Sequence, residues 1–387
     1  MALWEIVGGA DRGGILAREG RSLNSPGLKE RLATGAIVEE LELEGERLHY
    51  KLLEGGGPAE GWISTKVSGK DLAVPQRDAQ NLGGPGEAGT VTVDEVARRH
   101  LEEEAQMKQR EGALAIWLLK YKALGYPLPK PKLRVLCFHN EGSAECNFTC
   151  MGSPFVNWAK STKVVELCAF DYPGRNRMLK QAKLTSIDEL VPEMLAVFYD
   201  KLSDGVPYVV WGHAVGAWVA FELLVLARRV GLGMPKAGFF MAFPAPHIPV
   251  AQRPWHKSRY LNEEQMKEEI LCWDKSHYAG AGKVVFDMPT WKDVWEPLMR
   301  ADFQLFDDYK FKHRGFPKFE FPIHAWHFDG EHKIKPEMVQ LWKEWTTGTF
   351  DFDVLKGMGH VNCFYKPELK EQYFQKVTDQ LKSYLEL

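Results

Sequence analysis

Residues 208–216 read YVVWGHAVG, and this segment constrains the fold more than any other part of the chain. An apolar run is followed by a short turn bounded by Gly212 and Gly216, and then by the amphipathic run AWVAFELLVLARR. Such a pattern predicts a buried strand, a sharp turn and a helix that packs back onto the strand. Ala214 stands at the centre of that turn.

The residue at the centre of this turn decides which chemistry the turn can perform. In the nucleophile-elbow pattern Gly-x-Ser-x-Gly, the strand-to-helix turn exposes a serine that attacks an acyl carbon. This chain has Ala214 at the serine position, and a methyl group cannot act as a nucleophile. The sequence therefore predicts the architecture of a hydrolytic site without its attacking atom.

From residue 131 onward, apolar strand-like runs alternate with helical patterns. The strand-like runs are KLRVLCFH, KVVELCAFDY, PYVVWGHA, KAGFFMAF, FPIHAWHF and FDFDVLK. Apolar runs with little polar alternation, separated by helices, indicate a mostly parallel sheet that is covered on both faces. We therefore expect an α/β domain over residues 106–387, with its functional groups at the carboxyl ends of the strands.

The first part of the chain has a different texture. Residues 1–76 contain short alternating segments that end in glycine-containing turns, which predicts a small antiparallel β-barrel. Residues 77–105 are expected to hold a flexible, glycine-rich linker (77–91) and the start of a charged helix. The helical pattern of that charged segment continues over residues 93–125.

Composition narrows the classes of partner and compartment. The formal net charge of −3 does not favour nucleic-acid binding. No apolar run reaches the ~18 residues of a membrane-spanning helix, and the N-terminus lacks the pattern of a secretory signal. The six cysteines have no C-x-x-C spacing, and Cys137 and Cys168 lie in strand-like runs. Reduced core cysteines predict the cytoplasm or another reducing intracellular compartment.

Several motifs in residues 131–387 together resemble type II thioesterases, which are α/β-hydrolase enzymes of polyketide, fatty-acid and nonribosomal peptide synthesis. In chain order the motifs are CFHNEGSAECNF, YPGR, GHAVGAWVAFEL, PAPHIPVAQRPW, MRADFQLFDDYKF and MGHVNCFY. The segment over residues 4–75 resembles a bacterial-type SH3-like domain, through its Arg-Glu-Gly, TGAIVEELE and EGWIS segments.

This resemblance implies an α/β-hydrolase fold with a helical lid over about residues 247–297. It also implies acyl thioesters as substrates, carried on the phosphopantetheine arm of a carrier protein or on coenzyme A, and no cofactor. SH3-like domains bind peptides or cell-wall fragments, but a spacer without a ligand is an equal alternative here.

The site residues follow from the chain order Ser…Asp/Glu…His of this fold. His360 is expected to be the general base, and the acid that orients it is Glu331 or, less favoured, Asp329. The family pattern places the acid at Glu331. Two backbone N–H groups must stabilise the oxyanion, and those of Val215 and Glu141 are the candidates. The family usually has alanine where this chain has Glu141.

Two interpretations of Ala214 remain open. In the first, a serine was replaced here, so a thioesterase is inactive or strongly impaired as written. In the second, Ala214 is natural and the domain binds acyl chains or an acyl-carrier protein without turnover. An acyltransferase on the same fold is a third and weaker reading.

Other polar residues near these motifs have structural interpretations. His213 and His247 are expected to be structural, whereas Asp302 either bonds loops near the site or has a helix-capping or surface role. Cys146 and Cys150 lie off the elbow and are not expected to replace the nucleophile. The histidines around the acid loop come without a matching carboxylate or cysteine cluster, so no metal site is predicted; these are His324, His327 and His332.

Overall fold

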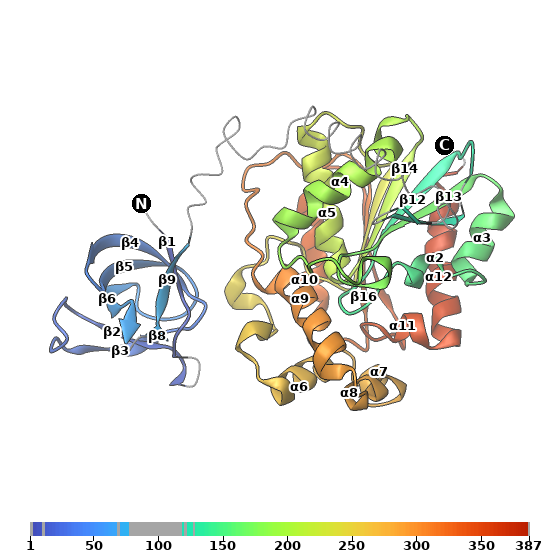
Figure 1. The fold of residues 1–387 in the computed structure, drawn as a ribbon. Coiled ribbons are helices and arrows are strands. Elements are labelled where there is room, and N and C mark those ends of the chain that lie inside the picture. Colours follow the sequence, from blue (N-terminus) through green and yellow to red (C-terminus); the bar gives the residue numbers. More distant parts are fainter. Residues whose placement is uncertain are drawn as a thin grey trace. The chain divides into compact units, whose positions relative to one another are not determined.

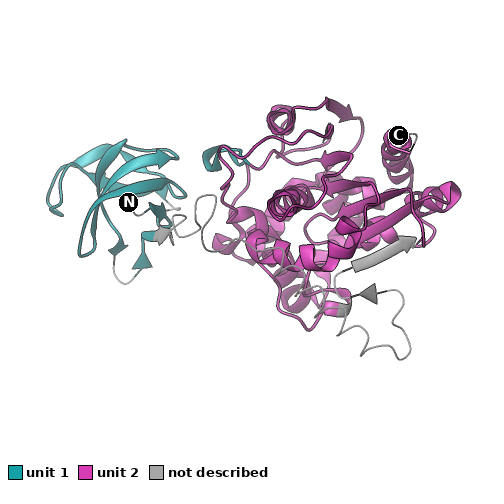
Figure 2. Cartoon of the chain, turned by 90° about the horizontal axis from the view of Figure 1, so that it is seen from above, with its two compact units in different colours: residues 1–90, 247–253 teal, residues 91–246, 254–387 magenta. Residues whose placement is uncertain are grey.

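The computed structural model describes residues 3–9, 12–67, 70–76, 118–119, 122–126 and 128–385. The chain divides into two compact units, one of residues 1–90 with 247–253 and one of residues 91–246 with 254–387 (Figure 2). The predicted linker and most of the predicted charged helix lie outside the described residues. The domain boundaries expected from the sequence therefore stay predictions.

The N-terminal unit consists of antiparallel β-structure. Its main sheet has the order β3-β2-β6-β5-β4-β1-β9. The bounds are β1 (Leu3–Ile6), β2 (Ile15–Arg18), β3 (Gly27–Leu32), β4 (Ile37–Glu44), β5 (Arg47–Glu54), β6 (Glu60–Ser64) and β9 (Ala73–Gln76), with a hairpin of β7 (Lys66–Val67) and β8 (Lys70–Asp71). Leu48 and Tyr50 alternate into its core, as period-2 burial requires. The predicted small all-β unit is confirmed, and an SH3-like identity stays a prediction.

The second unit is built on an eight-stranded sheet with the order β10-β11-β13-β12-β14-β15-β16-β17. The bounds are β10 (Leu118–Leu119), β11 (Lys122–Tyr126), β12 (Leu133–Phe138), β13 (Val165–Phe170), β14 (Tyr208–His213), β15 (Ala237–Met241), β16 (Ile323–Phe328) and β17 (Phe350–Leu355). The strands from β13 to β17 in this order pair in parallel. All six predicted apolar runs form strands, which confirms the α/β-hydrolase fold class.

The helix predicted over residues 93–125 is wrong at its C-terminal end. Residues 122–126 form β11, which pairs antiparallel with β13, and β10 adds a further short strand. The edge of β13 offers backbone donors and acceptors to any neighbouring segment. Pairing with that edge outweighs the helical charge pattern, because local propensity is a weak determinant compared with tertiary context.

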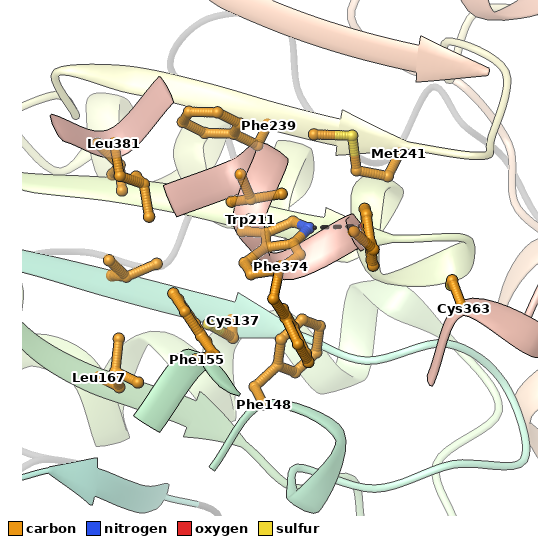
Figure 3. Close-up of a cluster of buried hydrophobic side chains, with 14 of the residues drawn as sticks. Cys137, Phe148, Phe155, Leu167, Trp211, Phe239, Met241, Cys363, Phe374 and Leu381 are labelled. Carbon is orange, nitrogen blue, oxygen red and sulfur yellow. Dashed lines mark hydrogen bonds between the residues drawn. The ribbon is translucent and has the colours of Figure 1, made fainter. Parts of the chain in front are cut away.

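Helices cover both faces of this sheet (Figure 1). On one face lie α3 (Pro154–Thr162) and α12 (Pro367–Lys382), whose apolar side chains join the core in Figure 3. There Trp211 of β14 packs against Phe155 and Phe374, and its Nε1 donates to the Tyr373 hydroxyl at 3.1 Å. On the other face α5 (Val215–Arg229) contacts β14 and packs beside α4 (Ile187–Ser203).

A mostly helical segment separates β15 from β16, in the region where the lid is expected. It contains α6 (Glu263–Trp273), α7 (Lys275–Tyr278), α8 (Val284–Asp287) and α9 (Glu296–Asp307). The first of these begins at a capping box in which Asn262 and Gln265 satisfy each other's backbone N–H groups. Among the described residues, this unit also has the short helices α2 (Cys146–Thr149), α10 (Pro336–Gln340) and α11 (Asn362–Tyr365). Within the described residues, no helix combines the length and apolarity that a membrane crossing requires.

Candidate active site

The turn after β14 has the strained geometry of a nucleophile elbow. Ala214 has φ 52° and ψ −128°, a conformation that non-glycine residues rarely adopt. Its N–H donates to the Met241 carbonyl at 2.9 Å, and its own carbonyl accepts from the Ala217 N–H at 2.9 Å. The sheet and the first turn of α5 thus fix the conformation, although Ala214 presents only a methyl group.

The two glycines of the elbow permit a close approach of backbone to backbone. A Cβ atom at Gly212 would lie 2.4 Å from the Gly216 carbonyl oxygen, and one at Gly216 would lie 2.2 Å from the Phe138 carbonyl oxygen. Neither position can hold a larger residue without moving the backbone. The same contact brings the elbow against the turn that follows β12.

His360 lies in the turn between β17 and α11, and its side chain is fully buried. Its Nδ1 is 2.7 Å from Oε1 of Glu331, and its Nε2 is 3.1 Å from Oε1 of Glu141. The ring also packs against Trp273, with 4.8 Å between the ring centroids. The imidazole is therefore enclosed by two carboxylates, which come from the turns after β16 and β12.

Asp329 does not contact His360. Its Oδ1 accepts from the Gly357 N–H at 2.7 Å, and its Oδ2 lies 3.8 Å from Nζ of Lys356. Asp329 thus braces the turn that leads into His360, whereas Glu331 meets the imidazole itself. The geometry favours Glu331 as the residue that orients His360.

The His360 turn is held in place by a residue that we did not predict. Asp274, at the end of α6, accepts from the N–H groups of Val361 and Asn362 through Oδ2, at 2.9 and 2.8 Å. Asn362 in turn accepts from the Gly359 N–H at 2.8 Å. The sequence signal at Asp274 is an N-cap before the short helix α7, which indicates a local role only.

The Glu141 turn is anchored from α9. Asp302 accepts from the Gly142 N–H at 2.7 Å and forms a buried ion pair with Arg175 through both carboxylate oxygens, at 2.8 and 2.5 Å. Arg175 also donates to the Ser143 carbonyl at 2.6 Å. Of the two roles considered for Asp302, bonding loops near the site is therefore the correct one.

The charges of this cluster act on one another strongly. Burial lowers the pKa of His360, but the adjacent Glu331 and Glu141 outweigh burial and hold that pKa well above its ordinary value. Burial raises the pKa of Glu331 to about 7, against the opposing effect of His360. The raised pKa favours the imidazolium form of His360, in which Nε2 donates its hydrogen bond to Glu141.

The candidate oxyanion donors follow two neighbouring strands, β14 and β12. Val215 is the first residue of α5, where a helical backbone has no acceptor for the N–H group. Glu141 follows β12, which pairs in parallel with β14 at Phe138 and Gly212. Both backbone groups therefore belong to turns at the same edge of the sheet, as an oxyanion hole requires.

His213 and His324 form hydrogen bonds within the fold rather than with the elbow. His213 bonds the Tyr373 hydroxyl at 3.0 Å and the His360 carbonyl at 2.6 Å. His324 bonds Asp351 at 2.9 Å and Tyr384 at 2.7 Å. Over the part of the chain that the structure describes, no group of three or more His, Cys, Asp or Glu side chains is arranged to hold a metal ion.

Comparison with known proteins agrees with this fold. Residues 135–365 match the thioesterase domain family, and the chain belongs to that family. Among curated relatives, the gramicidin S biosynthesis protein GrsT of Aneurinibacillus migulanus is 26% identical over 252 residues, which cover 65% of this chain and 90% of GrsT. Thioesterase PikA5 of Streptomyces venezuelae is 24% identical over 269 residues, which cover 69% of this chain and 85% of PikA5.

Solved structures show the same fold. The RedJ thioesterase of the prodiginine pathway in Streptomyces coelicolor aligns with a TM-score of 0.54 and 22% identity, over 64% of this chain and 85% of RedJ. The type II thioesterase BorB from the borrelidin biosynthetic cluster aligns with a TM-score of 0.52 and 24% identity, over 67% of this chain and 97% of BorB.

Proposed function

We propose that the α/β unit of this chain binds acyl thioesters carried on a carrier protein's phosphopantetheine arm or on coenzyme A, and that it does not form an acyl-serine intermediate. Membership of the thioesterase family supports the class of ligand. The gramicidin S biosynthesis protein GrsT and the thioesterase PikA5 support a biosynthetic setting, and the sequence motifs favour nonribosomal peptide or polyketide synthesis. A carrier protein is then the expected partner.

One observation carries the second half of this proposal. The elbow presents Ala214, and the Nε2 atom of His360, which would take the proton of a serine, is bonded to Glu141. Exchanging a serine for alanine in an otherwise intact site would leave Nε2 without a carboxylate partner. Glu141 therefore favours a site that has diverged over an enzyme that lost only its serine.

The N-terminal unit has a separate proposal. We infer that residues 3–76 form an SH3-like module, which the seven-stranded antiparallel sheet and its single apolar core support. The sequence segments that resemble the SH3-like family lie within this sheet. We assign no ligand to this module.

The proposal on thioester binding is tested with the unaltered chain and a non-hydrolysable ligand. Isothermal titration calorimetry would measure the binding of a long-chain S-alkyl coenzyme A thioether, with free coenzyme A as the matched control. We expect saturable binding of the thioether at one site per chain and much weaker binding of free coenzyme A. A fluorophosphonate, which labels activated serines, should leave the intact mass of the chain unchanged.

Two results would contradict the proposal. Equal affinity for the thioether and for free coenzyme A would show that the acyl chain has no site here. Stoichiometric labelling by the fluorophosphonate, mapped to a single serine, would show that the chain holds an activated serine elsewhere.

A further inference from the structure

The carboxylate of Glu141 has one oxygen engaged and one unused. Its Oε1 is bonded to Nε2 of His360 at 3.1 Å, whereas Oε2 is buried and has no hydrogen-bond partner among the described residues. Only 4% of this residue is exposed. A buried carboxylate oxygen without a donor is costly, so a donor is expected to bind there when the site is in use.

The carboxylate of Glu141 lies near the elbow and bonds the His360 atom that a serine nucleophile would bond. Residues 138–139 lie in backbone contact with Gly216 of the elbow, and Glu141 follows two residues later. Glu141 therefore takes the role of hydrogen-bond partner of His360 Nε2, which a serine hydroxyl has in a Ser-His-acid triad. A carboxylate with a free oxygen at this point is suited to accept a proton from water.

We propose that Glu141 is the general base of a direct hydrolysis, in which water rather than serine attacks the bound acyl thioester. This inference rests on the thioester-binding function proposed above. It makes Glu141 a catalytic residue, and it makes His360 the acid that protonates the leaving group.

The step balances with water as the only co-reactant. The water oxygen bonds to the acyl carbon while one water proton passes to Oε2 of Glu141. The N–H groups of Val215 and Glu141 stabilise the resulting oxyanion. When the oxyanion collapses, the carbon–sulfur bond breaks and the thiolate takes the Nε2 proton of His360. Transfer of the proton from Glu141 to His360 restores the site, with a carboxylic acid and a thiol as products.

The surrounding charges suit this assignment of roles. Glu331 holds the Nδ1 side of the imidazole at 2.7 Å, so the ring keeps its orientation while Nε2 gives up and regains a proton. The two carboxylates raise the pKa of His360, which favours the protonated form that a general acid requires. No acyl-enzyme forms, which is consistent with the methyl group of Ala214.

Glu141→Gln is the direct test, because glutamine keeps the size of the side chain and removes its basic oxygen. Glu145→Gln is the matched control: Glu145 is the next acidic residue along the chain and caps α2 through the Cys146 N–H. Hydrolysis of a series of acyl-CoA thioesters would be followed by chromatography of the free acid. A thiol reagent is unsuitable because Cys146 and Cys150 are exposed.

We expect the unaltered chain to hydrolyse at least one acyl-CoA faster than buffer does. General bases contribute roughly 10²–10⁴-fold, so Glu141→Gln should lower kcat by at least about 100-fold. Glu145→Gln should keep the rate of the unaltered chain. Binding of the S-alkyl thioether should persist in Glu141→Gln, which separates loss of chemistry from loss of the site.

Three outcomes would overturn the inference. They are no hydrolysis above buffer by the unaltered chain, a Glu141→Gln variant that is as active as the unaltered chain, or an acyl adduct in the intact mass during turnover. If Glu141→Gln fails to fold, Glu141→Asp keeps the charge but shifts the carboxylate, and full activity in that variant would also contradict the proposed geometry. Thioether binding without hydrolysis would refute this inference and leave the proposed binding function standing.

Discussion

His360 illustrates how a single neighbouring residue changes the chemistry that a triad-like geometry can perform. The chain order of the fold predicts that Glu331 lies beside His360. The two side chains are 2.7 Å apart, because β16 and β17 pair in parallel and the turns that follow them are adjacent. The direction of the Glu141 side chain could not be predicted. It depends on how Asp302 and Arg175, far away in the sequence, hold the turn after β12.

At the residue scale, the orienting acid can be tested in a serine-containing background, Ala214→Ser with Glu141→Ala. Adding Glu331→Gln should lower thioester hydrolysis by about 10²–10⁴-fold, because loss of the acid leaves the imidazole in the wrong tautomer. Adding Asp329→Asn, the matched control, should change the rate only a few-fold. Steady-state kinetics on one acyl-CoA would compare them, and the reverse ranking would assign the orienting role to Asp329.

At the scale of elements, the lid region is joined to the His360 turn through Asp274. Two backbone N–H groups in the turn depend on one carboxylate at the end of α6, and an unpaired buried donor costs about 1–3 kcal/mol. The sequence marks Asp274 only as a helix cap, since the partner turn lies almost ninety residues further along the chain. Long-range hydrogen bonds of this kind have no local sequence signal.

Asp274→Ala should therefore lower the free energy of unfolding by about 2–4 kcal/mol, because both N–H groups lose their acceptor. Urea denaturation would measure the change, with Asp293→Ala as a control because Asp293 is an exposed acid in the same region. If the two variants were equally stable, the Asp274 bonds would not contribute to holding the His360 turn.

Besides Asp302, the helix α9 contains a buried acid, Asp307, whose titration makes the stability of the fold depend on pH. Burial raises the pKa of Asp307 to about 7, partly offset by the bond that Asp307 accepts from the Ser258 N–H at 2.6 Å. A raised folded-state pKa stabilises the fold below the unfolded value of 3.8, and this contribution is lost as the pH rises toward 7.

In Asp307→Asn, the side chain stays neutral at every pH and can still accept from Ser258. The free energy of unfolding of the unaltered chain should therefore fall more between pH 5 and pH 8 than that of the variant, by about 2–3 kcal/mol. Urea titrations of both proteins at the two pH values would give this difference. Identical pH slopes would mean that Asp307 does not titrate in this window.

At the scale of the whole molecule, the alternation of apolar runs and helices predicts the parallel sheet, because strands buried on both faces need apolar residues throughout. The edge of the sheet was harder to predict. Residues 122–126 carry a mixed pattern, and only pairing with β13 makes them a strand. The predicted boundary between the two units rests only on the glycine-rich composition of residues 77–91, so it requires a test.

Two truncations provide that test. A fragment of residues 106–387 should be soluble and melt cooperatively, because it keeps β11 on the edge of β13. A fragment of residues 128–387 should melt at a lower temperature or aggregate, since it exposes that edge. Circular dichroism melts would compare the two fragments. If the fragment of residues 106–387 aggregated while the full chain was soluble, part of residues 1–105 would belong to the hydrolase core.

The central claim is that Glu141 forms the hydrogen bond to Nε2 of His360 that a serine hydroxyl would form in a triad, and so prevents His360 from activating a serine. The most direct measurement is hydrolysis of one acyl-CoA by Ala214→Ser, by Ala214→Ser with Glu141→Ala, and by Glu141→Ala alone. We predict that the serine alone gains little, and that the double variant exceeds it by at least about 100-fold, since a freed general base contributes roughly 10²–10⁴-fold. The double variant alone should also be labelled by a fluorophosphonate. Full activity and labelling of Ala214→Ser with Glu141 still in place would contradict the account.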